Sequence, residues 1–225
     1  MDFSFLLDGY YLNLLFQGLL VTLILALIAV FFGLLLALIL SLIRLANRKP
    51  LTWFVIAYVE LIRGTPIVVQ LIIVYSLMKL PVWLVGGVDL SPFIPGMVTL
   101  LINSSAYLSE VLRAGINSVD IGQSEAAWSL GLTPKQTLHK IVLPQAFKNI
   151  LPALGNEFVT LIKETSVLMY LGVSELTYQA AMIKSETYSY MESYLVAAFL
   201  YFLLTYPTSK LMIALEKRMK KADAK

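Results

Sequence analysis

The chain has 225 residues, of which 59% are hydrophobic and only 14% are charged. An average soluble domain has about 45–50% apolar and about 25% charged residues, so this composition excludes a disordered chain and argues against a water-soluble one. The absence of cysteine excludes disulfides and thiolate metal sites, and a single histidine, His139, leaves little room for histidine-based metal chemistry. A net charge of +3 is too small to indicate nucleic-acid binding. We therefore expect an integral membrane protein that contacts the lipid bilayer and holds no metal.

The first expected helix lies in residues 10–43, a run of 34 residues without a charge. A membrane span needs about 20 apolar residues, so this helix is long enough to cross the bilayer and extend beyond it. A secretory signal would have basic residues before a short apolar core, whereas this chain begins with the acidic Asp2 and its apolar run is too long. We therefore expect a retained first span.

Four further apolar segments follow, and we expect each of them to be a membrane span: residues 53–80, 93–112, 147–171 and 194–215. The first of these is interrupted by Gly64 and Pro66, which disfavour a regular helix, so local unwinding is expected there. The expected fold is an all-α integral membrane protein with five transmembrane helices, in a single transmembrane domain over residues 1–225.

The basic residues indicate how these spans are oriented. With five spans, thirteen of the 17 lysines and arginines lie on one side of the membrane: Arg44, Arg48, Lys49, Arg113, Lys135, Lys140, Lys148 and the six between Lys210 and Lys225. Loops rich in lysine and arginine stay in the cytoplasm. This asymmetry predicts an N-terminus outside the cell and a C-terminus in the cytoplasm.

The longest cytoplasmic connection, at about residues 114–146, has the pattern of two short helices. Residues 125–130 are predicted as a helix capped by Ser124 and stopped by Gly131, which supplies the left-handed backbone that ends many helices. A second helix is expected to restart at Thr133 with a capping box. The connection is therefore expected to be two short helices that meet at an angle and end before the fourth span.

Two interpretations of this connection remain open from the residues alone. Ala126 and Ala127 beside Trp128 are expected to be exposed and to form a small apolar knob that suits a groove on a partner protein. The alternative is a solvated connector with ordinary helix caps.

The same connection carries a recognisable motif. Glu125-Ala126-Ala127, three residues, Gly131, nine residues and then Ile141-x-Leu143-Pro144 match the spacing of the EAA loop of ABC importer permeases. The flanking segments are also similar to the polar amino acid importers of the histidine/glutamine permease type: residues 60–66 with Gln70, 107–116, 122–123, and 156–157 with 163–166. The chain thus resembles a membrane permease subunit of a polar amino acid ABC importer.

This resemblance implies a type I ABC importer transmembrane domain in the cytoplasmic membrane of a prokaryote. It implies that Glu125, Ala126, Ala127 and Gly131 contact separate ABC ATPase subunits. The other implied partners are a second permease subunit, identical or closely related, and an extracytoplasmic amino acid-binding protein. The chain has no G-x-x-x-x-G-K-[ST] phosphate loop, so we expect it to bind no cofactor and to be no enzyme itself, with ATP bound and hydrolysed on the partner ATPase.

Polar residues inside the expected spans are candidates for a substrate site, because ionisable groups are costly in a membrane. Arg63, Asn103 and Glu157 come from three spans and lie roughly 14 to 16 Å from the cytoplasmic ends of their helices, at about 1.5 Å per residue. Arg63 suits a carboxylate, Glu157 an ammonium group and Asn103 either, with Thr65 and Gln70 just beyond Arg63.

A structural role for the same residues is the alternative. Glu60 and Arg63 are three residues apart and would neutralise each other on one face of a helix. In that case these charges serve packing or gating instead of binding substrate. The residues do not identify the amino acid transported, because Glu157 would suit a basic side chain as well as the common ammonium group.

Two other classes of function are weighed against the importer. A secondary, ion-coupled amino acid transporter would use the same intramembrane charges, but such folds commonly have two related halves and this sequence has no internal repeat. An intramembrane enzyme would need a nucleophile and a base within reach of each other, whereas the one histidine is expected on the cytoplasmic side.

Overall fold

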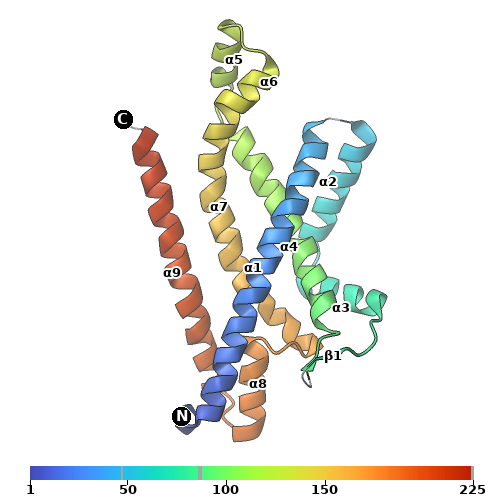
Figure 1. The fold of residues 1–225 in the computed structure, drawn as a ribbon, viewed down its shortest axis with the longest axis vertical. Helices are drawn as coiled ribbons and strands as arrows, with labels where there is room; N and C mark the ends of the chain where they lie inside the picture. Colours follow the sequence, from blue (N-terminus) through green and yellow to red (C-terminus); the bar gives the residue numbers. More distant parts are fainter. Residues whose placement is uncertain (47, 86–87, 224–225) are drawn as a thin grey trace.

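The computed structural model describes residues 1–46, 48–85 and 88–223 as long helices with one small hairpin (Figure 1). A short 3-10 helix, η1 (Ser4–Leu7), precedes α1 (Gly9–Leu45), a continuous helix of 37 residues that covers the predicted first span. The side chain of Asp8 accepts a hydrogen bond from the backbone N–H of Tyr10 and so caps this helix. Many of the buried residues of α1 are small: Gly18, Ala26, Ala29, Gly33, Ala37 and Ser41.

The second predicted span is two helices with a sharp bend between them. α2 (Lys49–Arg63) and α3 (Ile67–Met78) are bent by 111°. Pro66 lies in the extended region, with φ −65° and ψ 136°, and has no N–H to continue the hydrogen bonds of α2. The interruption was expected, but the expected local unwinding understates it, because the chain changes direction here.

A short antiparallel hairpin of β1 (Leu84–Val85) and β2 (Val88–Asp89) follows α3. The chain then enters α4 (Phe93–Asn117), which extends five residues beyond the predicted end at residue 112. The connection between the third and fourth spans is therefore shorter than the expected residues 114–146.

The connection contains α5 (Ile121–Ser129), the one-turn α6 (Pro134–Thr137) and a π-helix, η2 (Leu138–Val142), which runs directly into α7 (Leu143–Glu164). Pro144 does not separate the connection from the next span. It lies in the first turn of α7 and has no N–H to donate to the turn before it.

The chain after α7 has two elements that the sequence analysis missed. A 3-10 helix, η3 (Thr165–Leu171), completes the predicted fourth span, and α8 (Leu176–Thr187) follows it. The fully buried Glu175 caps α8 by accepting hydrogen bonds from the N–H groups of Thr177 and Tyr178. α8 has 12 residues, too few for a membrane span, so the search for apolar runs passed over it. The last helix, α9 (Glu192–Asp223), contains the predicted fifth span.

Two helices of the described chain are long and apolar enough to cross a membrane, residues 9–45 and 192–219. The bent pair α2 and α3 adds a third if it is counted as one span. α4 and α7 contain several polar residues, Asn103 and Glu110 in the first and Glu157 and Lys163 in the second. Five crossings, with the N-terminus outside, therefore stay a prediction.

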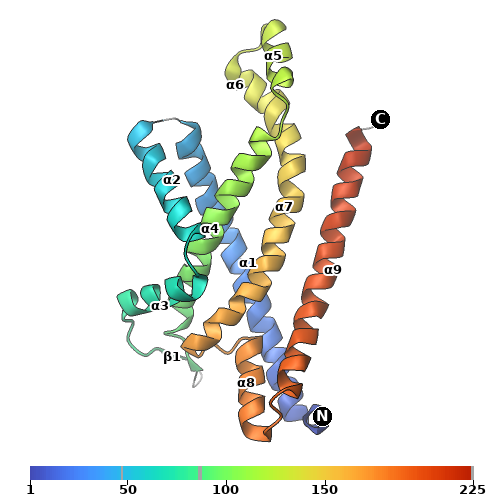
Figure 2. The same ribbon diagram turned by 180° about the vertical axis from the view of Figure 1, so that it is seen from behind.

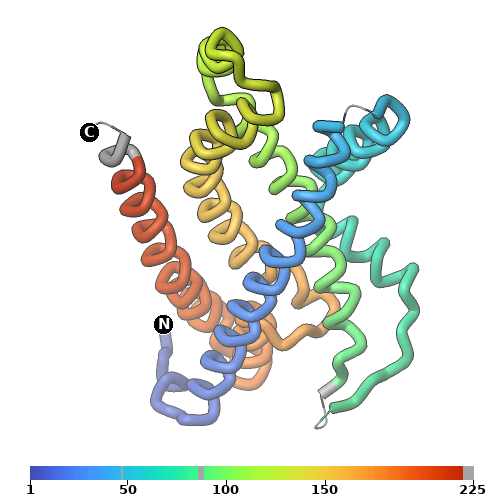
Figure 3. Tube along the Cα trace, turned by 45° about the horizontal axis from the view of Figure 1, so that its top comes forward, coloured from blue at the N-terminus to red at the C-terminus, as the bar shows by residue number. Residues whose placement is uncertain are grey.

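The helices pack along one another around α1 and α4, with α7 against α4, α9 against α7, and α8 between α1 and α9 (Figures 1 and 2). The central apolar cluster includes Leu25, Leu71, Leu100, Leu161 and Leu168. α5 and α6 project from the end of the molecule where α1 and α9 finish, while the N-terminus, α3, α8 and the hairpin lie toward the opposite end (Figure 3). The two ends of the bundle therefore carry different elements, with a projecting pair of short helices at only one of them.

Candidate functional site

The bend between α2 and α3 is held by the side chain of Gln70, which is buried. Its Nε2 atom lies 2.7 Å from the carbonyl oxygen of Ile62, 3.0 Å from that of Thr65 and 2.9 Å from Thr65 Oγ1. The Thr65 hydroxyl donates to the carbonyl of Leu61 at 2.9 Å. Gln70 thus replaces hydrogen bonds that the break in the helix removes, and its amide is engaged inside the protein.

Asn103 connects this bend to the middle of α4. It is 3% exposed, and its Nδ2 donates to Gln70 Oε1 at 3.1 Å. Its Oδ1 is buried and has no hydrogen-bond partner among the described residues. Because buried acceptors are nearly always paired, this unpaired oxygen is the one atom of the Gln70–Asn103 pair that leaves a hydrogen bond unmade.

Arg63 is the last residue of α2, and its exposed side chain lies beside α4. Its guanidinium carbon lies 5.5 Å from the centre of the Tyr107 ring, a cation–π distance. Tyr107 is four residues after Asn103, so the two side chains share one face of α4. The ion pairs found among the described residues do not include one between Glu60 and Arg63, and the structural role of these charges stays a prediction.

Glu157 lies apart from this group. It is half-buried on α7, and no hydrogen bond or ion pair of the described residues joins it to Arg63, Asn103 or Gln70. The structure therefore brings together four of the five predicted site residues, Arg63, Thr65, Gln70 and Asn103, and leaves Glu157 on a neighbouring helix. Their part in substrate binding stays a prediction.

A cavity of about 230 Å³ lies beside the bend and is lined by Leu61, Ile62, Thr65, Val69, Gln70, Ile73, Val74, Thr99 and Ile102. Its lining is mostly apolar and includes no charged side chain. Because the charged Arg63 lies outside it, the polar face of α4 is a better candidate than this cavity for a zwitterionic ligand.

Two sets of polar residues around α4 were missed by the sequence analysis. The Tyr58 hydroxyl donates to the carbonyl of Ile102 at 2.9 Å and lies 2.7 Å from Ser105 Oγ, which ties α2 to α4. Nearer the end of α4, Glu110 accepts from Arg44 at 3.0 Å and pairs with Arg113 as well. Of these contacts, only the pair of Glu110 and Arg113 could have been predicted from the sequence, because the two residues are three apart on one helix.

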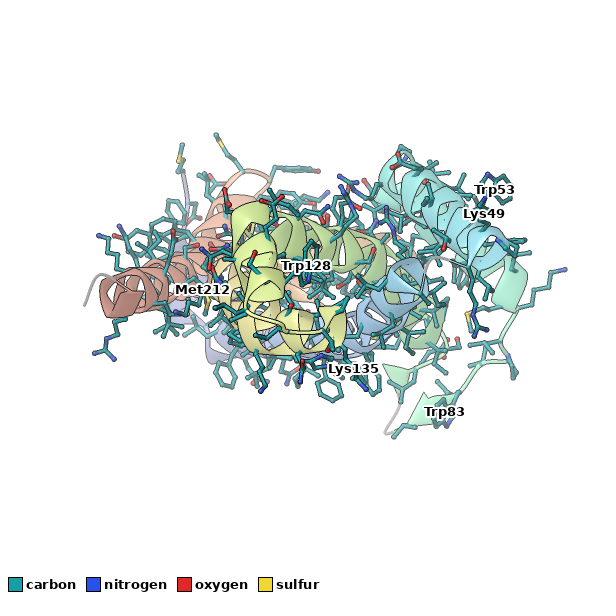
Figure 4. The ribbon with its side chains drawn as sticks, turned by 90° about the horizontal axis from the view of Figure 1, so that it is seen from above. Lys49, Trp53, Trp83, Trp128, Lys135 and Met212 are labelled. Carbon is teal, nitrogen blue, oxygen red and sulfur yellow. The ribbon has the colours of Figure 1, made fainter. Side chains whose placement is uncertain are left out.

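The second candidate site is the loop of α5 and α6, seen end-on in Figure 4, where Trp128 lies over the helices. Glu125, Ala126 and Gly131 are exposed, but Ala127 is buried, at 5%. The prediction that both alanines are exposed is therefore wrong for Ala127. α5 packs against the following π-helix. Consecutive residues of an α-helix are turned by about 100° from each other, so Ala126 and Ala127 lie on different sides of α5, and Ala127 is on the side that faces the protein.

The caps of this loop are partly as predicted. Gly131 has a φ of +81°, the left-handed backbone expected of it, and Thr133 with Gln136 forms the complete capping box. The cap of α5 is Asp120, whose side chain accepts from the N–H of Gly122 at 2.7 Å. Ser124 lies inside the helix and not at its start, because α5 begins earlier than the motif alone indicated.

Comparison with known proteins supports the motif. The family described as binding-protein-dependent transport system inner membrane component matches residues 29–221. The arginine transport system permease protein ArtQ of Bacillus subtilis (strain 168) is 36% identical over 207 residues, which cover 92% of this chain and 93% of ArtQ. The L-cystine transport system permease protein TcyB of the same organism is 37% identical over 209 residues, covering 92% of this chain and 87% of TcyB.

Solved structures show the same fold. A chain from the crystal structure of an amino acid ABC transporter with histidines has a TM-score of 0.88 and 43% identity, and the match covers 97% of this chain and 100% of that one. A chain of the MetNI methionine ABC transporter in an inward-facing conformation has a TM-score of 0.69 at 20% identity, covering 96% and 98%. The chain belongs to the family of binding-protein-dependent transport system inner membrane components and is a permease component of an amino acid ABC importer.

Proposed function

We propose that this chain moves polar amino acids across the cytoplasmic membrane of a prokaryote by alternating access, driven by ATP hydrolysis on separate ATPase subunits. The observation that carries the proposal is the projecting loop of α5 and α6 (Figure 1). It presents Glu125, Ala126 and Gly131 beyond the ends of the long helices. An exposed short helix at the predicted cytoplasmic end is suited to dock into a cleft on an ATPase.

The proposed assembly follows from the same family. Five spans, formed by α1, by α2 with α3, and by α4, α7 and α9, place the N-terminus outside and the C-terminus in the cytoplasm. A second permease subunit, identical or closely related, completes the pathway, and an extracytoplasmic amino acid-binding protein delivers the substrate. This chain binds no cofactor, and ATP is bound by the partner ATPase.

Substrate recognition is proposed for the face of α4 that meets the bend. The exposed guanidinium of Arg63 receives the substrate carboxylate, and the unpaired Oδ1 of Asn103 accepts from the ammonium group. Thr65 and Gln70 hold the bend in shape around them. Glu157, on α7, contributes a second acceptor for a cationic group. The names of the relatives, an arginine and a cystine permease, support polar amino acids as the substrate class.

The ATPase interface is tested by adding bulk to the projecting helix. Ala126→Trp places an indole on the exposed face of α5 without filling the protein interior. The matched control is Val82→Trp, at a position that is 70% exposed near the hairpin at the other end of the molecule. Tagged chains are purified from source membranes in mild detergent, and co-purifying proteins are identified by mass spectrometry.

We expect an ATPase subunit to co-purify with the native chain and with Val82→Trp, and to be lost with Ala126→Trp. Retention of the ATPase by Ala126→Trp would move the interface away from α5. Absence of any ATPase from the native chain, together with uptake that survives ATP depletion and collapses with the ion gradient, would instead establish a secondary transporter.

A further inference from the structure

The junction between the projecting loop and α7 has two unusual features. The π-helix η2 joins α6 to α7 without a break, and the N–H of Leu143 donates to the carbonyl of Leu138, five residues back. Pro144 follows directly and has no N–H to donate. Single-turn π-helices occur frequently at functional sites. The chain therefore enters α7 through a segment whose helical hydrogen bonds are shifted.

One side chain spans this junction. Gln145 Nε2 donates to the carbonyl of Ile141 in the π-helix at 3.1 Å, and the same atom lies 3.3 Å from Oε1 of Gln123 on α5. Gln123 is exposed and Gln145 is half-buried, so the link lies on the outside of the loop. It connects the projecting helix to the first turn of α7 by a route other than the backbone.

A second link lies one turn further along. Asn149 Nδ2 donates to Ser118 Oγ at 2.8 Å, and that hydroxyl donates to the carbonyl of Gly115 at 2.7 Å, at the end of α4. Gln145 and Asn149 are four residues apart and share one face of α7. The start of α7 is thus tied to α5 by one amide and to α4 by the other.

The remainder of α7 is packed closely against α4 and α9. A Cβ atom at Gly115 of α4 would overlap Ile150 of α7, and one at Gly155 of α7 would overlap Met212 of α9. Ala146 is fully buried between these links. We therefore expect a displacement applied at Gln145 to move the first turns of α7, as far as Pro152, which lies inside the helix and has no N–H to donate.

We propose that Gln145 is the positioning residue that makes α5 and α7 move together, so that displacement of the projecting helix changes the membrane part of the transporter. This inference rests on the proposed coupling to an ATPase. Without the Gln123–Gln145 link, no side-chain hydrogen bond found among the described residues joins α5 to α7, and α5 remains connected to it through the chain and through packing against α6 and the π-helix. The ATPase would then still bind and hydrolyse ATP, but less of each cycle would reach α7.

The test uses the complete transporter, permease with ATPase and binding protein, in proteoliposomes. The measured quantity is the number of amino acid molecules taken up per ATP hydrolysed. Gln145→Met and Gln123→Met each remove the amide and nearly preserve side-chain length. Gln136→Met is the matched control in the same loop, because the side-chain hydrogen bonds of Gln136 found among the described residues are to Thr133 at the cap of α6.

For Gln145→Met we expect normal ATPase recovery and hydrolysis with a fall of at least about five-fold in uptake per ATP, the lower end of measured couplings between sites. Gln123→Met should do the same, and the double variant should be no worse than either, because the two residues form one link. Gln136→Met should keep the native ratio.

Two outcomes would overturn the inference. An unchanged ratio in Gln123→Met, whose exposed side chain is not needed for folding, would show that the link does not transmit motion. Additive losses in the double variant would show two independent effects. If the native complex itself shows no ATP-driven uptake, the proposed function fails instead, which distinguishes the two results.

Discussion

At the scale of single residues, small side chains decide how closely the helices approach. A Cβ atom added to Gly33 would overlap Ser104, one at Gly115 would overlap Ile150, and one at Gly155 would overlap Met212. Between helices in a membrane there is little hydrophobic driving force, so close contact of backbones and side chains supplies much of the stability. These glycines therefore matter for packing and not for backbone freedom, since each lies inside a helix.

Gly115→Ala tests this packing. Although alanine favours a helix by about 0.5–1 kcal/mol over glycine, the overlap with Ile150 should cost about 1–3 kcal/mol, so a net loss of stability is expected. Thermal unfolding in detergent measures it. Gly9→Ala, at the start of α1 with no atom within 4 Å of the added Cβ, should leave the midpoint nearly unchanged. Equal midpoints for the two variants would contradict the tight α4–α7 contact.

At the scale of elements, the bend between α2 and α3 is the feature that most shapes the candidate site. It turns the chain by 111° and leaves carbonyl groups of α2 without their helical partners. Gln70 supplies those partners from α3, and Asn103 fixes Gln70 from α4. The bend therefore depends on one amide of α3 and one of α4, and Arg63 lies at the end of α2 where the bend begins.

Gln70→Leu should destabilise the protein by about 1–3 kcal/mol, because partly buried carbonyl oxygens and the buried Asn103 amide would lose their partners. The thermal midpoint in detergent checks this. The control is Gln17→Leu, which makes the same change on the exposed side of α1. A loss of substrate binding in Gln70→Leu without a loss of stability would favour direct contact between Gln70 and the substrate.

At the scale of the whole molecule, the two ends of the bundle have different chemistry. The loop of α5 and α6 and the C-terminal end of α9 lie at one end, and the N-terminus, α8 and the hairpin lie toward the other. Basic residues gather at the first end, Lys135, Lys140 and Lys148 among them. Because basic loops are retained in the cytoplasm, this arrangement supports the proposed orientation.

The orientation is tested with single cysteines, since the native chain has none. Val82→Cys and Lys135→Cys both replace exposed residues, one near the hairpin and one in the loop of α6. A membrane-impermeant maleimide should label Val82→Cys in intact cells or spheroplasts and Lys135→Cys only after permeabilisation. The reverse pattern would invert the orientation, and labelling of both from outside would mean that α4 does not cross the membrane.

Much of the local structure could be predicted because its causes are local. The uncharged run before Arg44 forms a single continuous helix, α1. The predicted capping box begins at Thr133, and Gly131 adopts the predicted left-handed backbone. Helix caps and breakers act within a few residues, so they are visible in the sequence. The family was visible for the same reason, since the EAA motif lies in one continuous loop.

The parts that the sequence analysis missed depend on contacts between distant segments. Ala127 turned out to be buried although Ala126 beside it is exposed, because α5 lies against the π-helix. Nothing in the sequence indicated that the Gln70 amide is bonded to Asn103, 33 residues away, and to the bend, while its part in substrate binding stays a prediction. Hydrophobic runs and caps are properties of short stretches, and they determined the membrane class and the long helices. The EAA motif, which also lies in one short stretch, indicated the family. The direction of the bend, the partners of the buried amides and the Gln123–Gln145 link were decided only by tertiary packing, because a hydrogen bond between distant segments exists only once the helices have come together.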